Sequence, residues 1–241
     1  MFQFATVTDK GSRKINEDSI GVFQNGDNFG CVLCDGLGGH GMGDEASKLV
    51  KDVFTDVFYK TKDIKNFLKT AFCAAQDILL LEQSSKNAKN KMKTTAVSFV
   101  ADNKNLYIGH IGDSRLYLFR KNKVMLRTID HSVPQMLALS GDIKESEIRN
   151  HHDRNIVLKV MGIDWENEEF DLMKPISLKK CQAVLLCSDG FWELIDEKEM
   201  CNYLKSAGSV DEWLEMMQDE VRSKGTGKNM DNYSAIAVWN I

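Results

Sequence analysis

Residues 94–130 hold four short apolar runs with almost nothing between them, and this spacing limits the fold more than any other feature of the chain. The runs TTAVSFVAD, NLYIGHIGD, SRLYLFR and KVMLRTID are rich in β-branched and aromatic residues and are separated by turn residues. Connections this short join antiparallel strands, because a parallel pair needs a crossover of a dozen or more residues. The pattern predicts an antiparallel meander built of hairpins.

Helices are predicted on either side of this region. Apolar residues recur at helical spacing over residues 46–58 and 64–79, so each segment buries one stripe. Capping-box patterns beginning at Asp196 and Ser209 predict two further helices. Further strands are predicted at FATVTD, SIGVFQN, FGCVLCD, AVLLCSD and YSAIAVWNI. The predicted architecture is mixed, with helices packed outside antiparallel sheets.

Residues 131–162 differ from the rest, since they are polar, charged and interrupted. A short helix is expected to begin near Ser132 and Pro134 and to end at Gly141. We interpret this segment as a lid or flap. The chain of 241 residues is 43% apolar and shows no linker-like seam, so we expect one compact domain over residues 1–241.

Charge and composition argue against several classes of protein. The formal net charge of −4 argues against broad binding to nucleic acid or anionic membranes, which need a basic face. We find no signal sequence and no stretch of roughly 20 apolar residues, so we expect a soluble, cytoplasmic protein. The six cysteines lie in apolar runs, which suits buried reduced thiols better than disulfides.

The glycine loop from Gly36 to Gly41 matches the dinucleotide fingerprint G-x-G-x-x-G, but its context does not. That fingerprint needs a βαβ unit with an acidic residue at the end of the second strand. Here Asp56 falls inside a helical run, and another helix follows. Asp35 would also place a carboxylate against the pyrophosphate. A dinucleotide site is therefore disfavoured.

Aspartates at strand ends offer another explanation for the loop. An apolar run ends in Asp-Gly twice, at Asp35 and Asp189, while Asp18 and Asp231 stand just before strands. In an antiparallel sheet the end of one strand lies beside the start of its neighbour, so these four carboxylates can gather at one edge. Such oxygen-only clusters suit Mg²⁺ or Mn²⁺. The alternative is that each Asp-Gly is an ordinary turn.

The motifs in sequence order resemble those of a known family, the metal-dependent serine/threonine protein phosphatases of type 2C, in their compact bacterial form. The resemblance implies an α+β fold in which two antiparallel sheets stack as a sandwich, with helices on both outer faces. The motifs that carry it run through nearly the whole chain: Arg13-Lys14-Ile15-Asn16-Glu17-Asp18, Asp35-Gly36-Leu37-Gly38-Gly39, Thr94-Thr95, Gly112-Asp113-Ser114-Arg115, Asp130-His131-Ser132, Ser188-Asp189-Gly190 and Asp231-Asn232.

The resemblance implies a hydrolase with two metal ions, Mn²⁺ or Mg²⁺. Asp35 would bridge both ions. The Gly36 carbonyl and Asp18 would bind on one side, and Asp189 and Asp231 on the other. Activated water would then attack phosphorus in line.

Three further residues receive roles from the same resemblance. Glu17 would hold a water at the metals, and Arg13 would bind the phosphate through its planar fork. Asp113 would help to hold a weaker third metal together with Asp189. The alternatives are an ordinary surface charge for Arg13 and a hairpin turn at Gly-Asp-Ser for Asp113.

The general acid is left open. Leu37 stands where eukaryotic relatives carry a histidine proposed for this role, and His40 is the nearest titratable residue on the loop. His40 could instead only order the turn, with a water supplying the proton.

These features predict hydrolysis of phosphoserine and phosphothreonine on proteins, in a monomer that acts against a cognate Ser/Thr kinase and its targets. The alternative is a catalytically weak adaptor of the same fold that binds phosphoproteins, which would be expected to have lost metal ligands. A calcium-binding protein is disfavoured, because the chain has no D-x-D-x-D-G loop.

Overall fold

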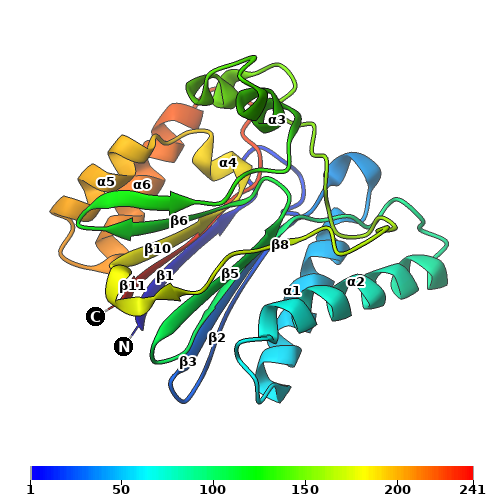
Figure 1. The fold of residues 1–241 in the computed structure, drawn as a ribbon. Coiled ribbons are helices and arrows are strands. Elements are labelled where there is room, and N and C mark those ends of the chain that lie inside the picture. Colours follow the sequence, from blue (N-terminus) through cyan, green and yellow to red (C-terminus); the bar gives the residue numbers. More distant parts are fainter. Residues whose placement is uncertain (1, 241) are drawn as a thin grey trace.

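Two antiparallel sheets face each other at the centre of the molecule (Figure 1). The computed structural model describes residues 2–240, apart from the side chain of His40. The first sheet has the order β1 (Phe2–Asp9), β11 (Tyr233–Asn240), β10 (Ala183–Cys187), β6 (Arg115–Arg120) and β7 (Lys123–Arg127). The second has the order β2 (Asp18–Asn25), β3 (Asn28–Asp35), β4 (Ala96–Ala101), β5 (Asn105–Ile111) and β8 (Asp171–Leu172), and β9 (Ile176–Ser177) also pairs with β5.

Helices cover the outer face of each sheet (Figure 1). Helices α1 (Gly43–Lys60) and α2 (Phe67–Ser85) pack on the sheet that contains β2 to β5. Helices α5 (Glu197–Ser206) and α6 (Val210–Gly225) pack on the other sheet. The predicted sandwich with helices on both outer faces is confirmed. None of the helices described within residues 2–240 is both long enough and apolar enough to cross a membrane.

Three apolar layers hold these elements together. Side chains from both sheets, among them Leu33, Phe99, Leu118 and Val238, fill the space between the sheets. Separate clusters lie under α1 and α2 and under α5 and α6. Central strands are therefore covered on both faces and read as continuous apolar runs, which explains why β4 and β10 are buried throughout.

The predicted meander over residues 94–130 is wrong in one respect. Its four strands form two hairpins in different sheets, because β4 pairs with β5 and β6 pairs with β7, while β5 and β6 do not pair. Residues 112–114 therefore carry the chain from one sheet to the other and are not a hairpin turn. Local patterns specify a hairpin but not the sheet to which it belongs, since both sheets bury the same kind of strand. The short strands β8 and β9 were not predicted.

The caps predicted for the flap helix and for α6 are confirmed, whereas α2 (Phe67–Ser85) begins and ends later than the predicted segment 64–79. The flap helix α3 (Val133–Ser140) has Ser132 as its N-cap, which accepts a hydrogen bond from Gln135 N at 3.4 Å, and it ends at Gly141 with φ of 87°. Ser209 caps α6 by accepting from Glu212 N at 3.1 Å. At α5, however, Asp196 makes no capping hydrogen bond among the described residues.

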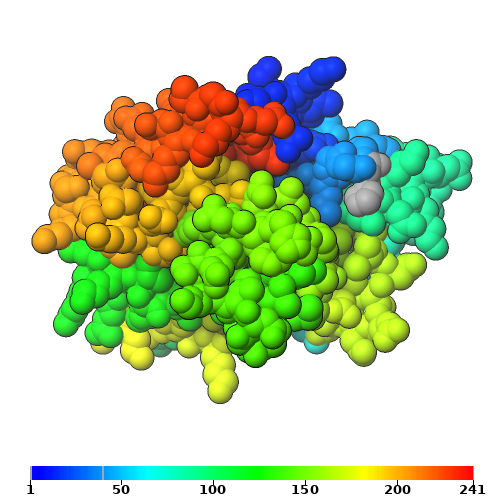
Figure 2. Space-filling view, turned by 90° about the horizontal axis from the view of Figure 1, so that it is seen from above, coloured from blue at the N-terminus to red at the C-terminus, as the bar shows by residue number. Residues whose placement is uncertain are grey.

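The remaining short helices connect these elements. They are η1 (Gly38–His40) after β3, η2 (Glu145–Asn150) in the flap, η3 (Leu178–Lys180) before β10 and α4 (Asp189–Trp192) directly after β10. Figure 2 shows the flap, in green, on the same face as the N-terminal loop in blue and the segment before β11 in red. One face of the molecule thus brings together the flap, the loop after β1 and the segment before β11.

The turn after β3 is packed so closely that it excludes a side chain at Gly36. A Cβ atom there would lie 2.2 Å from Gly43 O and 2.7 Å from Glu17 O, and both of these are backbone atoms. Gly36 N also donates to Glu17 O at 3.1 Å. The glycine is required because the backbones on either side of the loop touch.

We expect Gly36→Ala to destabilise the protein by about 1–3 kcal/mol, since neither backbone oxygen can move aside without shifting its chain. Gly39→Ala is the matched control, because a Cβ at Gly39 meets no described atom within 4 Å. Thermal unfolding of both variants measures the difference. Equal melting temperatures for the two variants would contradict the packing argument.

Candidate active site

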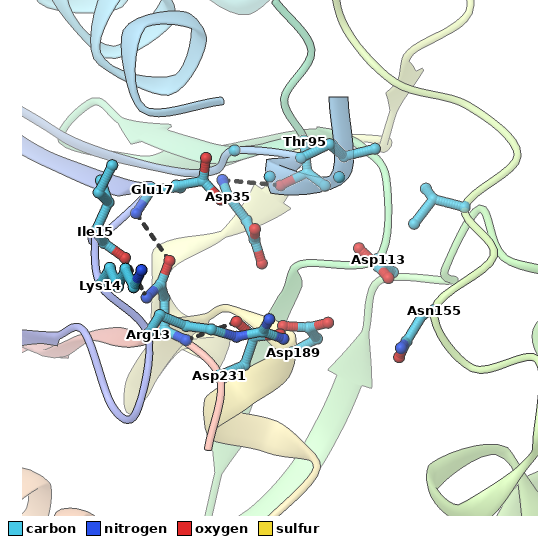
Figure 3. A pocket seen from close by; sticks show the side chains of 16 residues that line it. Arg13, Lys14, Ile15, Glu17, Asp35, Thr95, Asp113, Asn155, Asp189 and Asp231 are labelled. Carbon is cyan, nitrogen blue, oxygen red and sulfur yellow. Dashed lines mark hydrogen bonds and ion pairs between the residues drawn. The ribbon is translucent and has the colours of Figure 1, made fainter. Parts of the chain in front are cut away.

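A cavity of about 590 Å³ opens at the end of the sandwich where β2 begins and β3 ends (Figure 3). Asp18 and Asp35 are direct partners in the register of these strands, as predicted from the meeting of strand ends. Asp189 begins α4 directly after β10, and Asp231 lies just before β11, which pairs with β10. The sandwich thereby gathers carboxylates from both sheets.

Most of the residues predicted from the sequence line this cavity. Five are carboxylates, and the cavity is also bordered by two basic side chains, those of Arg13 and Lys14. The predicted site residues found in its wall are Arg13, Glu17, Asp35, Gly36, Asp113, Asp189 and Asp231.

Asp18 does not line the cavity, and only 8% of it is exposed. Ser188 Oγ donates to its Oδ2 atom at 2.9 Å. Its Oδ1 atom is buried and accepts no hydrogen bond from any residue that the structure describes. A buried carboxylate oxygen without a donor is costly, and a cation would remove that cost.

The carboxylates perturb one another. Burial, followed by the charges of its neighbours, raises the pKa of Asp18 to about 7. For the same reasons the pKa of Asp189 is raised to about 6. Burial also holds the pKa values of Asp35 and Asp113 well above their usual range, and the charge of Asp189 adds to both shifts. Within the described residues this cluster has one salt bridge, with Arg13, so its side chains leave most of the negative charge uncompensated.

Arg13 is the cation that contacts the cluster directly. Its Nη2 atom lies 2.7 Å from Asp231 Oδ2, and the two side chains are 49% and 45% exposed. Exposed ion pairs contribute at most about 1 kcal/mol, so the guanidinium can leave this partner at little cost. The residues present therefore fit divalent cations bound through oxygen, with an arginine beside them that can turn to an anion.

Hydrogen bonds from the backbone and from hydroxyl groups fix the carboxylate-bearing strands. Asp35 N donates to Thr95 Oγ1 at 3.1 Å, while Asp35 O accepts from Thr94 Oγ1 at 2.9 Å and from Thr95 N at 2.8 Å. Glu17 N donates to Asn232 Oδ1 at 2.8 Å. The end of β3 and the start of β2 are thus held from outside their own hairpin.

Sequence reasoning missed these supporting residues. Thr95, Ser188 and Asn232 lie inside the quoted motifs, but no role was predicted for them. Their position beside a predicted ligand was the only available indication. The sequence predicted the flap, but it did not single out Asn155 and Val157, two flap residues that line the cavity.

His40 belongs to η1 by its backbone. Its side chain lies outside the described part of the structure, so its predicted role as general acid stays a prediction.

Comparison with known proteins identifies the family. The family model described as protein phosphatase 2C matches residues 10–231. This chain belongs to the protein phosphatase 2C family. The resemblance and the enzyme class predicted from the motifs are confirmed, and the supporting relatives of this phosphatase are bacterial.

Serine/threonine phosphatase stp of Listeria welshimeri is 32% identical over 231 residues, which cover 92% of this phosphatase and 91% of the relative. The crystal structure of serine/threonine phosphatase Stp1 from Staphylococcus aureus is 29% identical, covers 100% of this chain and 96% of its own, and has a TM-score of 0.90. The catalytic domain of PstP, solved in complex with 2 manganese ions, has a TM-score of 0.81 at 24% identity over 99% and 97% of the two chains, and shows the same fold.

The raised pKa values predict that the metal-free phosphatase loses stability as pH rises. Asp18 and Asp189 titrate near pH 7 and 6 when folded but near about 4 when unfolded, so between these values the folded state binds more protons. The stabilisation is complete below about pH 4 and is lost as pH rises through the folded pKa values, by an amount on the order of a few kcal/mol.

Thermal unfolding in EDTA from about pH 5 to 8 measures this loss. Asp35→Asn should flatten the profile, because it removes one carboxylate from the cluster. Asp219→Asn, at an exposed position on α6, should leave the profile unchanged. A flat profile for the unmodified protein would contradict the prediction.

Proposed function

We propose that this chain is a metal-dependent phosphatase that removes phosphate from phosphoserine and phosphothreonine on proteins. The observation that carries the proposal is the gathering of carboxylates from both sheets around one open cavity, with Arg13 at its edge. Membership of the protein phosphatase 2C family and similarity to stp and Stp1 support it. Phosphoproteins are accordingly the expected substrates.

The carboxylates can be assigned to the metal ions that they would bind. We propose that Asp35 would help to hold both ions, that Asp18 and the Gly36 carbonyl would help to hold one of them, and that Asp189 and Asp231 would help to hold the other. Asp113 and Asp189 would hold a third, weaker ion. Bound Mn²⁺ or Mg²⁺ supplies two effects: it lowers the pKa of water and neutralises charge on the phosphoryl group.

The protein's own side chains bind and orient the reactants. Arg13 can exchange Asp231 for two phosphate oxygens through its planar fork. Burial raises the pKa of Glu17, which lines the cavity and is placed to accept a hydrogen bond from water. Asn232 fixes the Glu17 backbone and also donates to Lys10 O and Ile15 O at 3.0 and 2.9 Å. The loop that carries Arg13 and Glu17 is thereby attached to the segment that carries Asp231.

The adaptor alternative is not favoured, because every predicted metal position retains an oxygen ligand. We also propose that residues 1–241 form one catalytic domain, since the first strand pairs with the last along its whole length. We still expect the protein to be a cytoplasmic monomer whose activity opposes that of a Ser/Thr kinase.

Metal removal should abolish activity. We expect hydrolysis of p-nitrophenyl phosphate and of a phosphothreonine peptide to stop in EDTA and to return with Mn²⁺ or Mg²⁺ but not with Ca²⁺, whose larger coordination sphere fits the site less well. Thiol alkylation of the folded enzyme should not inhibit it, because burial raises the pKa of Cys34, the thiol next to Asp35. Turnover that survives complete chelation would refute the mechanism.

Arg13→Ala should raise KM for a phosphopeptide by about tenfold or more, since a charge-assisted hydrogen bond contributes roughly 1.5–3 kcal/mol. Arg13→Lys keeps the charge and loses the fork, so its KM should lie between those of the unmodified and alanine proteins. Steady-state kinetics at saturating Mn²⁺ give both values. An unchanged kcat/KM in Arg13→Ala would make Arg13 a simple surface charge.

His40→Ala tests the general acid. If His40 donates the proton, the variant should lose roughly 10²-fold on a phosphoserine peptide and much less on p-nitrophenyl phosphate, whose leaving group needs no acid. Rates are measured for both substrates across the acidic limb of the pH profile. Equal losses on the two substrates would leave water as the proton donor.

A further inference from the structure

Trp192 makes a contact that the sequence gives no reason to expect. Its side chain is buried, with 2% exposed, and its Nε1 atom donates to the backbone oxygen of Asp113 at 3.0 Å. Trp192 is the last residue of α4, and Asp189 is the first. One hydrogen bond therefore joins the short helix that carries Asp189 to the loop that carries Asp113.

The loop over residues 112–114 has other anchors, but they lead to other elements. Ser114 Oγ lies 2.8 Å from Thr95 Oγ1, which ties the loop to the segment before β4. Gly112 O accepts from His131 N at 2.9 Å, and Gly112 N donates to His131 Nδ1 at 3.2 Å. Among the hydrogen bonds that the structure describes, only the one from Trp192 connects this loop with α4.

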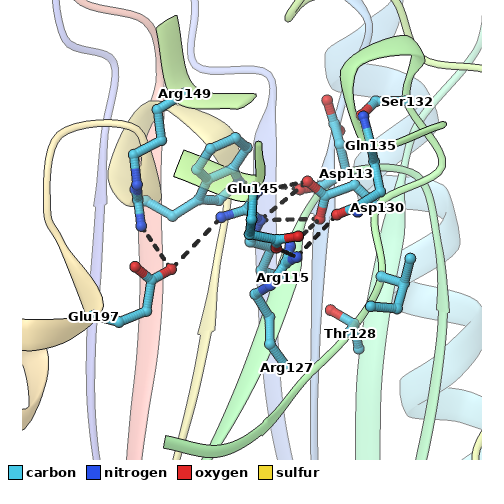
Figure 4. A network of polar contacts seen from close by, with 12 residues as sticks. Asp113, Arg115, Arg127, Thr128, Asp130, Ser132, Gln135, Glu145, Arg149 and Glu197 are labelled. Atoms are coloured by element: carbon cyan, nitrogen blue, oxygen red, sulfur yellow. Dashed lines mark hydrogen bonds and ion pairs between the residues drawn. The ribbon is translucent and has the colours of Figure 1, made fainter. Parts of the chain in front are cut away.

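The orientation of the indole is itself fixed by a buried cation. Arg115 Cζ lies 3.4 Å from the centroid of the Trp192 ring, and Arg115 is held by Asp130 through contacts of 2.9 Å from Nε and 2.6 Å from Nη2 (Figure 4). The side chains of Arg115 and Asp130 are 3% and 0% exposed. A guanidinium stacked on one face leaves the ring little freedom to turn its N–H away from Asp113 O.

The carboxylates joined in this way oppose each other. Asp113 and Asp189 line the same cavity, so their side chains repel each other when both are ionised. Without a link between α4 and the loop, this repulsion would favour a wider separation. A cation that binds both must then draw them together again, at a cost in affinity.

We propose that Trp192 is a positioning residue, whose indole N–H holds the Asp113 loop against α4 so that Asp113 and Asp189 can share a divalent cation. This inference rests on the proposed function, because it assumes that these carboxylates bind metal. Trp192 does not line the cavity, and it acts through its hydrogen bond to the Asp113 backbone. Its removal should therefore weaken the binding of the shared ion and leave the other ions in place.

The test is Trp192→Phe, which keeps an aromatic ring beneath Arg115 and removes the N–H. Calorimetric titration with Mn²⁺ should show the weakest binding step of the unmodified protein weakened by roughly 10-fold, as for other residues that orient metal ligands. The Mn²⁺ concentration for half-maximal hydrolysis of p-nitrophenyl phosphate should rise equally, while kcat recovers at saturating Mn²⁺. A Mn²⁺ titration identical to that of the unmodified protein would overturn the proposal.

Trp213→Phe is the matched control. Trp213 is also buried, and its Nε1 atom donates to the backbone oxygen of Met200 at 3.1 Å, in the core under α5 and α6. Both variants lose the same kind of buried hydrogen bond and should lose thermal stability alike. Only Trp192→Phe should change the Mn²⁺ titration, so an equal shift in Trp213→Phe would refute a specific role for Trp192.

A double-mutant cycle isolates the route through Asp113. In an Asp113→Asn background, Trp192→Phe should cause no further loss of Mn²⁺ affinity, because the residue to be positioned has lost its charge. A full additional loss in that background would contradict the proposal.

If Trp192→Phe does not fold, benzothienylalanine at position 192 keeps the shape of tryptophan, lacks the N–H and gives the same comparison. An unmodified protein that binds no Mn²⁺ would instead refute the proposed function itself.

Discussion

Mutual repulsion among carboxylates at one end of the sandwich is the constraint on which the rest of this structure depends. Asp18 and Asp35 face each other across one sheet, and Asp189 and Asp231 follow and precede paired strands of the other. Burial, and after it the charges of neighbouring carboxylates, raises the pKa values of Asp18 and Asp189, so their ionised forms would be more stable in water. The fold must therefore hold these groups together until cations compensate their charge.

The scaffold does this through contacts that lie behind the carboxylates. Thr94 and Thr95 hold the backbone of Asp35, Ser188 donates to Asp18, and Trp192 holds the loop of Asp113. Polar contacts extend the same network away from the cavity, from Arg115 through Tyr117 to Glu197. Figure 4 shows Glu197 paired with Arg149. The favourable free energy of packing the two sheets and their helices thereby offsets the repulsion between these carboxylates.

The flap is attached to the same framework at both ends. At its start, Asp130 pairs with Arg115 and His131 N donates to Gly112 O, so the start of the flap contacts the Asp113 loop. At its end, Met161 forms a bridge with Thr94, and Gln83 of α2 donates to Gly162 O at 2.7 Å. Any displacement of the two ends of the flap would consequently move the segments that position Asp35 and Asp113.

The sequence by itself determined all the described strands except β8 and β9, the long helices, the flap helix and the aspartates of the site. These depend on local periodicity, on turn and cap residues and on motifs whose members are neighbours in the chain. Tertiary structure alone decided that β4–β5 and β6–β7 belong to different sheets, and that Asp113 lies on a crossover between them. It also decided the supports of the site, since Ser188 is 170 residues from Asp18 and Trp192 is 79 residues from Asp113. A buried tryptophan looks in sequence like any other core residue, and only the packing of α4 against the crossover loop directs its N–H to the Asp113 backbone.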